Sequence, residues 1–211
     1  MDFTALSFGS LVLLIIGPVL IAGCVHLTVM KYQWCSWLAL PLDGGLMVYG
    51  RRLFGAHKTI RGLLVMILVT SISYGLIQML LFDRGVSIIW LEGAALGLGY
   101  ILGELPNSFL KRQWGIQAGV TPRGVAGLFF SLFDQVDSVL GIAVAVRLLF
   151  ALPWSTIGWL VVAGTVVHIL VDYCAIQFGC KPRRSPMKRY ILSQLFIFVV
   201  SKCIFRVLNS V

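Results

Sequence analysis

Asp134 and Asp137 lie three residues apart in a long apolar stretch. Residues at this spacing share one face of a helix, so both carboxylates can point into a single cavity. Without a cation between them, they would repel each other and raise one pKa. Mg²⁺ relieves this conflict, because it is commonly held by one or two carboxylates plus substrate phosphates. The spacing predicts a magnesium site, and the alternative is that both acids pair with loop arginines and only stabilise the fold.

A second polar group follows another apolar run. Glu104 comes first, and Ser108, Lys111 and Arg112 follow within two helical turns. At three- and four-residue spacing, the hydroxyl and the two cations can line one side of a helix. Lysine binds phosphate oxygens as a point charge and arginine binds them as a fork. The segment fits a phosphate site, although Lys-Arg at a membrane boundary is also an ordinary topology signal.

A third candidate group lies in the first basic connection. A turn around Asp43, in the sequence PLDGG, is followed by GRRLFGAHKTIRG, which places Lys58, Thr59 and Arg61 directly before the next apolar run. Glycines let backbone amides approach an anion, and the cations supply charge. The G-x-x-x-x-G-K-[ST] frame of a P-loop is absent, so a nucleotide or phosphate would be bound in some other way.

The composition of the chain indicates a membrane protein rather than a soluble one. Of 211 residues, 59% are hydrophobic and 12% are charged, whereas soluble domains carry about 25% charged residues. The net charge of +9 would suit a nucleic acid. The cations, however, lie in short segments between long apolar runs, which favours membrane orientation and phosphate binding. We therefore expect no nucleic-acid partner.

Five apolar runs are long enough to cross a hydrocarbon core of about 30 Å. They cover residues 8–30, 62–82, 86–103, 127–150 and 154–176. Most lysines and arginines fall in the connections after the first and third runs and in the tail after the fifth. The positive-inside rule therefore places the N-terminus outside and two long loops in the cytoplasm. The predicted fold is an all-α, multi-pass protein of the cell membrane.

Two further features concern packing and the C-terminus. The third run contains Gly93-x-x-x-Gly97 and Gly99-x-x-x-Gly103, spacing that lets another helix approach closely, within the chain or in a second copy. Residues 190–211 contain an apolar stretch too short for a clear sixth span, so we expect an interfacial helix there. Residues 1–189 are predicted to form one membrane domain.

His168 and Asp172 lie one helical turn apart near the end of the fifth run. They either support the candidate site or satisfy each other within the bundle, and the sequence leaves both interpretations open.

The segments PLDGG, GRRLFGAHKTIRG, LGELPNSFLKRQWGIQAG and FDQVDSVLG together resemble the CDP-archaeol synthase family, membrane cytidylyltransferases related to phosphatidate cytidylyltransferase. The resemblance implies that CTP and a lipid phosphate react to give a CDP-lipid and pyrophosphate. Family members usually carry aspartate at the position of Glu104 and lysine at that of Gln117, so this chain resembles a divergent branch.

The resemblance also implies residue roles. Asp134 and Asp137, with Glu104 assisting, would hold Mg²⁺, and Lys111 would join them in catalysis. The implied nucleotide- and phosphate-binding residues are Ser108, Arg112, Lys58, Thr59, Arg61 and Asp43. Two alternatives are a small membrane transporter and an inactive lipid-binding relative. A transporter would distribute its acids across the membrane depth, whereas these acids cluster at one end.

Overall fold

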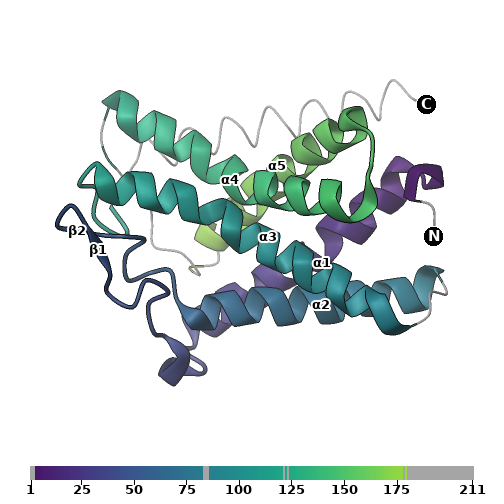
Figure 1. The fold of residues 1–211 in the computed structure, drawn as a ribbon, viewed down its shortest axis with the longest axis horizontal. Coiled ribbons are helices and arrows are strands. Elements are labelled where there is room, and N and C mark those ends of the chain that lie inside the picture. Colours follow the sequence, from purple (N-terminus) through teal and green to yellow (C-terminus); the bar gives the residue numbers. More distant parts are fainter. Residues whose placement is uncertain (1–2, 83–85, 121, 123, 178, 180–211) are drawn as a thin grey trace.

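The computed structural model is described for residues 3–82, 86–120, 122, 124–177 and 179, and within them five long helices form the fold. They are α1 (Phe8–Lys31), α2 (Ile60–Phe82), α3 (Val86–Gln113), α4 (Gly124–Phe150) and α5 (Trp154–Gln177). Each is long and apolar enough to cross a membrane. The helices alternate in direction (Figure 1). The prediction of an all-α membrane bundle with five spans is confirmed.

Short elements mark the two ends of the bundle. The connection between α1 and α2 carries the 3-10 helix η2 (Ser36–Leu38) and an antiparallel hairpin of β1 (Met47–Val48) and β2 (Arg51–Arg52). The 3-10 helix η1 (Phe3–Ala5) and the turn between α4 and α5 lie at the opposite end (Figure 1). We call these the hairpin end and the N-terminal end. The sequence patterns did not predict the hairpin.

The third helix is longer than its apolar run. We expected the span to end at residue 103, but α3 continues through Pro106 to Gln113. A span is recognised by its apolarity, whereas a helix continues into water wherever its residues are good helix formers, as Glu, Leu, Lys and Gln are. The second connection is therefore much shorter than predicted, and Ser108, Lys111 and Arg112 lie on a helix.

The glycines of α3 hold the bundle together. A Cβ at Gly97 would lie 2.6 Å from the Met66 carbonyl oxygen of α2, and one at Gly103 would lie 2.9 Å from the Gly141 Cα of α4. Only glycine permits backbones to cross this closely. In the structure these glycine surfaces are used by contacts within the chain.

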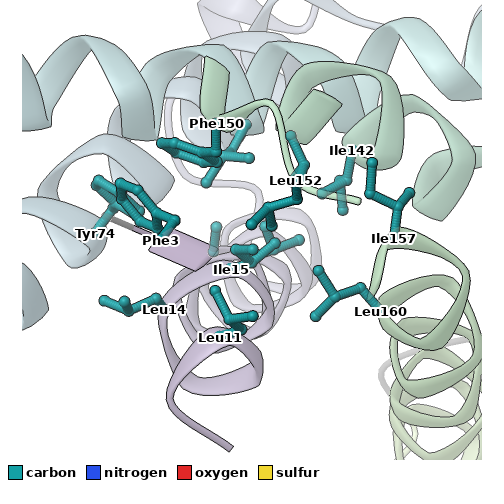
Figure 2. Packing of buried hydrophobic residues seen from close by; sticks show 14 of the residues in the cluster. Phe3, Leu11, Leu14, Ile15, Tyr74, Ile142, Phe150, Leu152, Ile157 and Leu160 are labelled. Atoms are coloured by element: carbon teal, nitrogen blue, oxygen red, sulfur yellow. The ribbon is translucent and has the colours of Figure 1, made fainter. Parts of the chain in front are cut away.

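A hydrophobic core fills the N-terminal end. Phe3 stacks on Phe150 with ring centroids 4.1 Å apart, and Leu14 and Tyr74 are fully buried (Figure 2). Close packing of this kind gives a membrane bundle its rigidity, because lipid supplies no hydrophobic force between helices. The predicted C-terminal helix at 190–211 and the domain boundary at 189 lie outside the described residues.

Candidate active site

The hairpin end contains a polar cavity of about 330 Å³. Its walls come from all five long helices, from the segment that precedes α2 and from the connection between α3 and α4. The cavity brings together most of the residues singled out in the sequence, namely Lys58, Glu104, Ser108, Lys111, Arg112, Asp134 and Asp137. Residues more than 70 positions apart thus share one compartment, which is the first requirement for a common chemical role.

One face of α3 supplies a polar stripe to this cavity. Glu104, Asn107, Ser108 and Lys111 all line it and recur at three- and four-residue spacing. Asn107 is 2% exposed and was not among the predicted residues. Its position one turn after Glu104 and one turn before Lys111 is the signal that would have found it.

Asn107 joins the two aspartates of α4. Its Nδ2 donates to Asp134 Oδ1 at 2.7 Å and to Asp137 Oδ2 at 2.6 Å. Lys111 Nζ also donates to Asp134 Oδ1. Both carboxylates therefore converge on one point, as their spacing predicted. The Asn107 Oδ1 atom is buried there and has no hydrogen-bond partner among the described residues.

Glu104 takes a different partner. It forms an ion pair with Lys58, and both side chains are largely buried. Burial would lower the pKa of Lys58, but Glu104 and the more distant aspartates together raise it. No three carboxylate, histidine or cysteine side chains gather closely enough to hold a metal ion in the part of the chain that the structure describes. The structure therefore does not assemble the predicted set of three carboxylate ligands.

Asp43 stabilises the first connection instead of lining the cavity. Its side chain is fully buried and accepts hydrogen bonds from the backbone N–H groups of Gly45, Phe54 and Gly55 and from Arg52. Burial alone would raise the pKa of Asp43, but these donors lower it to about 2. In the structure the loop's own donors occupy the oxygens of Asp43, and this side chain does not line the cavity.

Thr59 and Arg61 are also structural. Thr59 Oγ1 accepts a hydrogen bond from Gly62 N at 3.2 Å at the start of α2, as a helix-capping residue does. Arg61 is 2% exposed, and its Nη1 donates to the Trp34 carbonyl at 2.9 Å. Neither side chain lines the cavity. In the structure both side chains make contacts that fix the connection beside Lys58.

The fifth helix completes the cavity wall. His168 and Asp172 both line it, and both contact Gln135 of α4. His168 Nδ1 lies 3.2 Å from the Gln135 carbonyl oxygen, and Gln135 Nε2 donates to Asp172 Oδ2 at 3.3 Å. These contacts agree with the interpretation that His168 and Asp172 support the candidate site, because both residues contact α4, the helix that carries Asp134 and Asp137.

A basic recess of about 440 Å³ adjoins the cavity. Arg112 lines both spaces, and Arg51 and Arg52 line the recess alone. The buried Nε atoms of Arg52 and Arg112 have no hydrogen-bond partner among the described residues. Gln117, at the position where the family usually has lysine, lies in this recess rather than in the cavity. The hairpin end thus offers guanidinium donors beside the two aspartates.

Comparison with known proteins agrees with this arrangement. A family model of CarS-like CDP-archaeol synthases matches residues 38–183, which include every aspartate, glutamate, lysine and arginine that lines the cavity. The chain belongs to the CDP-archaeol synthase family. A CDP-archaeol synthase from Thermofilum pendens is 31% identical over 166 residues, covering 78% of this chain and 75% of that relative. One from Aeropyrum pernix is 31% identical over 144 residues, covering 67% and 76%.

A solved structure gives the same result for the fold. It is described as an intramembrane enzyme for archaeal membrane lipid biosynthesis, with a TM-score of 0.50 and 27% sequence identity. The match covers 72% of this chain and 94% of that one. The protein is therefore a multi-pass membrane enzyme of the cytidylyltransferase class, and the predicted family and enzyme class are confirmed.

Proposed function

We propose that this enzyme transfers a cytidylyl group from CTP to a lipid phosphate. An oxygen of the lipid phosphate attacks the α-phosphorus of CTP, and the bond from that phosphorus to the bridging oxygen of the β-phosphate breaks. The products are a CDP-lipid and pyrophosphate. The observation that carries the proposal is the convergence of Asp134, Asp137 and Lys111 on one point of a polar cavity between membrane-spanning helices.

The protein's task in this reaction is alignment and charge neutralisation. A phosphate monoester is already anionic near neutral pH, so no strong general base is required. Lys58, Lys111 and Arg112 would hold phosphate oxygens, with Ser108 as a neutral donor. Lys58 and Lys111 are paired with Glu104 and Asp134. Each lysine is therefore held at the cavity wall before the substrates arrive, which lowers the entropic cost of binding them.

The donor atoms suit magnesium. The carboxylate oxygens of Asp134 and Asp137 converge on Asn107 Nδ2, and the buried Asn107 Oδ1 is a third hard oxygen on the same amide. Mg²⁺ prefers oxygen ligands and keeps several positions for water and phosphate. Asp134, Asp137 and Asn107 would hold it, in place of the set with Glu104. Bound there, the ion would neutralise charge on the nucleotide's phosphates during the transfer.

The orientation follows from the nucleotide. CTP is a cytosolic substrate, so the hairpin end would face the cytoplasm and the N-terminus the outside of the cell membrane. The cations of the hairpin end agree with the positive-inside rule. A cysteine-accessibility map with the hairpin end outside would contradict the proposal, because the cavity would then have no access to CTP.

A direct assay tests the reaction. Purified protein in nanodiscs is incubated with radiolabelled CTP, Mg²⁺ and either phosphatidate or an ether-linked isoprenoid lipid phosphate. We expect a labelled CDP-lipid with at least one substrate and its loss in Asp134→Asn and Asp137→Asn. Asp83→Asn, which follows the last residue of α2 in the sequence, is the matched control and should retain activity. A folded wild-type protein that forms no CDP-lipid from either substrate would refute the proposal.

A further inference from the structure

We propose that Phe130 of α4 is a positioning residue for Lys111 and holds its ammonium group at the cavity wall through a cation–π contact. The proposal rests on the proposed function, because Lys111 is one of the groups that would hold phosphate there. It goes beyond that function by assigning a role to an apolar side chain that does not itself line the cavity.

Lys111 meets two groups of α4. Its Nζ atom donates to Asp134 Oδ1 and also lies over the ring of Phe130, 5.6 Å from the ring centroid. A cation within about 6 Å of a ring centroid is attracted by the negative charge of the ring face. Phe130 and Asp134 are four residues apart, so α4 presents the ring and the carboxylate on one face. One helix therefore binds the ammonium group through two different interactions.

The ring of Phe130 is itself fixed in place. It is 1% exposed. Trp114, which follows the last residue of α3, meets it edge to face with ring centroids 5.3 Å apart and an interplanar angle of 82°. Phe129 makes a second contact of this kind, at 5.3 Å and 76°. Such T-shaped contacts match the positive edge of one ring to the negative face of the other. The two neighbouring rings therefore hold Phe130 where its face meets Lys111.

The surroundings strengthen the contact. The Lys111 side chain is 16% exposed, and the ring beneath it is buried. Water therefore competes little for the ammonium group, and the attraction between a cation and a ring is stronger where water is excluded.

The ring supplies something that Asp134 alone does not. In the proposed reaction Asp134 would also hold Mg²⁺, and a carboxylate attracts a lysine less strongly when it shares its charge with a divalent ion. An aromatic ring has no oxygen ligand to offer that ion. Phe130 therefore keeps Lys111 at the cavity wall through a contact for which the ion does not compete.

The alternative is that Phe130 only packs α3 against α4. Fluorinated phenylalanines separate the two roles, because fluorine withdraws charge from the ring face while the ring keeps nearly the same shape. Position 130 is occupied in turn by 4-fluoro-, 3,4,5-trifluoro- and pentafluorophenylalanine. The same series at Phe129 is the matched control, since Phe129 lies beside Phe130 and no lysine or arginine of the described residues lies over its ring.

A first measurement needs no enzymatic activity. Reductive dimethylation keeps the charge of a lysine and gives it methyl groups that NMR detects. The Lys111 signal, assigned by its absence in Lys111→Arg, should lie upfield because the methyl groups sit over a ring face. This upfield shift should vanish in Phe130→Leu and persist in Phe129→Leu. A Lys111 signal without an upfield shift in the otherwise unchanged protein would overturn the proposal.

A second measurement follows the rate of CDP-lipid formation. Along the fluorinated series at position 130, kcat/KM should fall stepwise by about threefold to thirtyfold in all, which is the range that a cation–π contact covers. The series at position 129 should keep the wild-type value. A constant kcat/KM at position 130 would overturn the proposal, as would an equal decline at both positions. Absence of CDP-lipid in the wild type would instead refute the proposed function, and the NMR comparison would still decide whether Phe130 holds Lys111.

Discussion

Replacement of Asp43 by asparagine tests how the first connection positions the site. The Asp43 carboxylate holds three backbone N–H groups and Arg52, and the neighbouring Leu42 N–H donates to the Lys58 carbonyl oxygen at 2.7 Å. Lys58 therefore reaches the cavity from a segment that Asp43 orders. Asparagine keeps one acceptor oxygen but leaves Arg52 without its counter-charge.

The magnitude follows from the pKa. Folding lowers the pKa of Asp43 from 3.8 to about 2, and at about 1.4 kcal/mol per pKa unit the ionised carboxylate contributes about 2 kcal/mol to the folded connection. Because the folded pKa lies below the unfolded one, this contribution is complete above about pH 4 and disappears as the pH falls toward 2. Asp43→Asn should lose it at every pH.

Hydrogen exchange measures this effect locally. In Asp43→Asn, the amides of Gly45, Phe54 and Gly55 should exchange about 30-fold faster at neutral pH, which is the ratio that about 2 kcal/mol gives. The KM for CTP should also rise in Asp43→Asn, because the segment that holds Lys58 at the cavity is less well ordered. Tyr49→Asn is the control in the same connection, because Tyr49 is 94% exposed with a left-handed φ of 50° that asparagine tolerates. Unchanged exchange in Asp43→Asn would refute the reasoning.

Three further predictions concern the cavity and its scaffold. Asp134→Asn and Asp137→Asn should each lower kcat by about 100-fold, as loss of one charge-stabilising group does. A magnesium titration of the initial rate should reach half-maximum at a higher Mg²⁺ concentration in each variant, because a ligand of the ion is lost; an unchanged titration in both would contradict the metal assignment. Lys58→Met and Glu104→Gln should be coupled by about 1–3 kcal/mol in a double-mutant cycle of thermal unfolding. Since the pKa of Lys58 is raised, the coupling should hold at neutral pH and weaken as the pH rises through that pKa, so a loss of coupling between pH 6 and 8 would contradict the prediction. Gly103→Val should destabilise the α3–α4 crossing by about 3 kcal/mol, measured against Gly158→Val as a control in open space.

Helical spacing explains which site residues could be predicted. Asp134 and Asp137 lie three apart, and Ser108 and Lys111 lie three apart, so each pair had to share a face once the helices formed. The structure confirms that all four line one cavity. The same spacing argument applied to α3 includes Asn107, although residue type alone does not mark this position because an amide carries no charge.

The first connection shows where sequence patterns fail. Asp43, Thr59 and Arg61 were grouped with Lys58 because they are polar and close together in the chain. A loop has no fixed periodicity, so proximity in sequence does not determine which side chains face the cavity. In the structure only Lys58 of these four does, while Asp43 binds the loop's own amides and Arg61 binds the Trp34 carbonyl. Hydrogen bonds to backbone groups determine where the side chains of Asp43 and Arg61 lie, and such bonds cannot be read from residue type.

The charges of the cavity suggest what a divalent cation would contribute to the proposed reaction. Lys58, Lys111 and Arg112 contribute three positive charges, and Glu104, Asp134, Asp137 and Asp172 contribute four negative ones. The cavity is thus slightly acidic before a triphosphate enters it, and two of its lysines are already paired with carboxylates.

A nucleotide entering this space would face carboxylates as well as cations, and like charges brought together in a poorly hydrated site are costly. Mg²⁺ on the two aspartates would convert the acidic half of the cavity into a phosphate-binding surface, while the adjoining arginine recess receives the remaining negative charge. The two aspartates would then hold the ion, and the ion together with Lys58, Lys111 and Arg112 would bind the phosphates of the nucleotide.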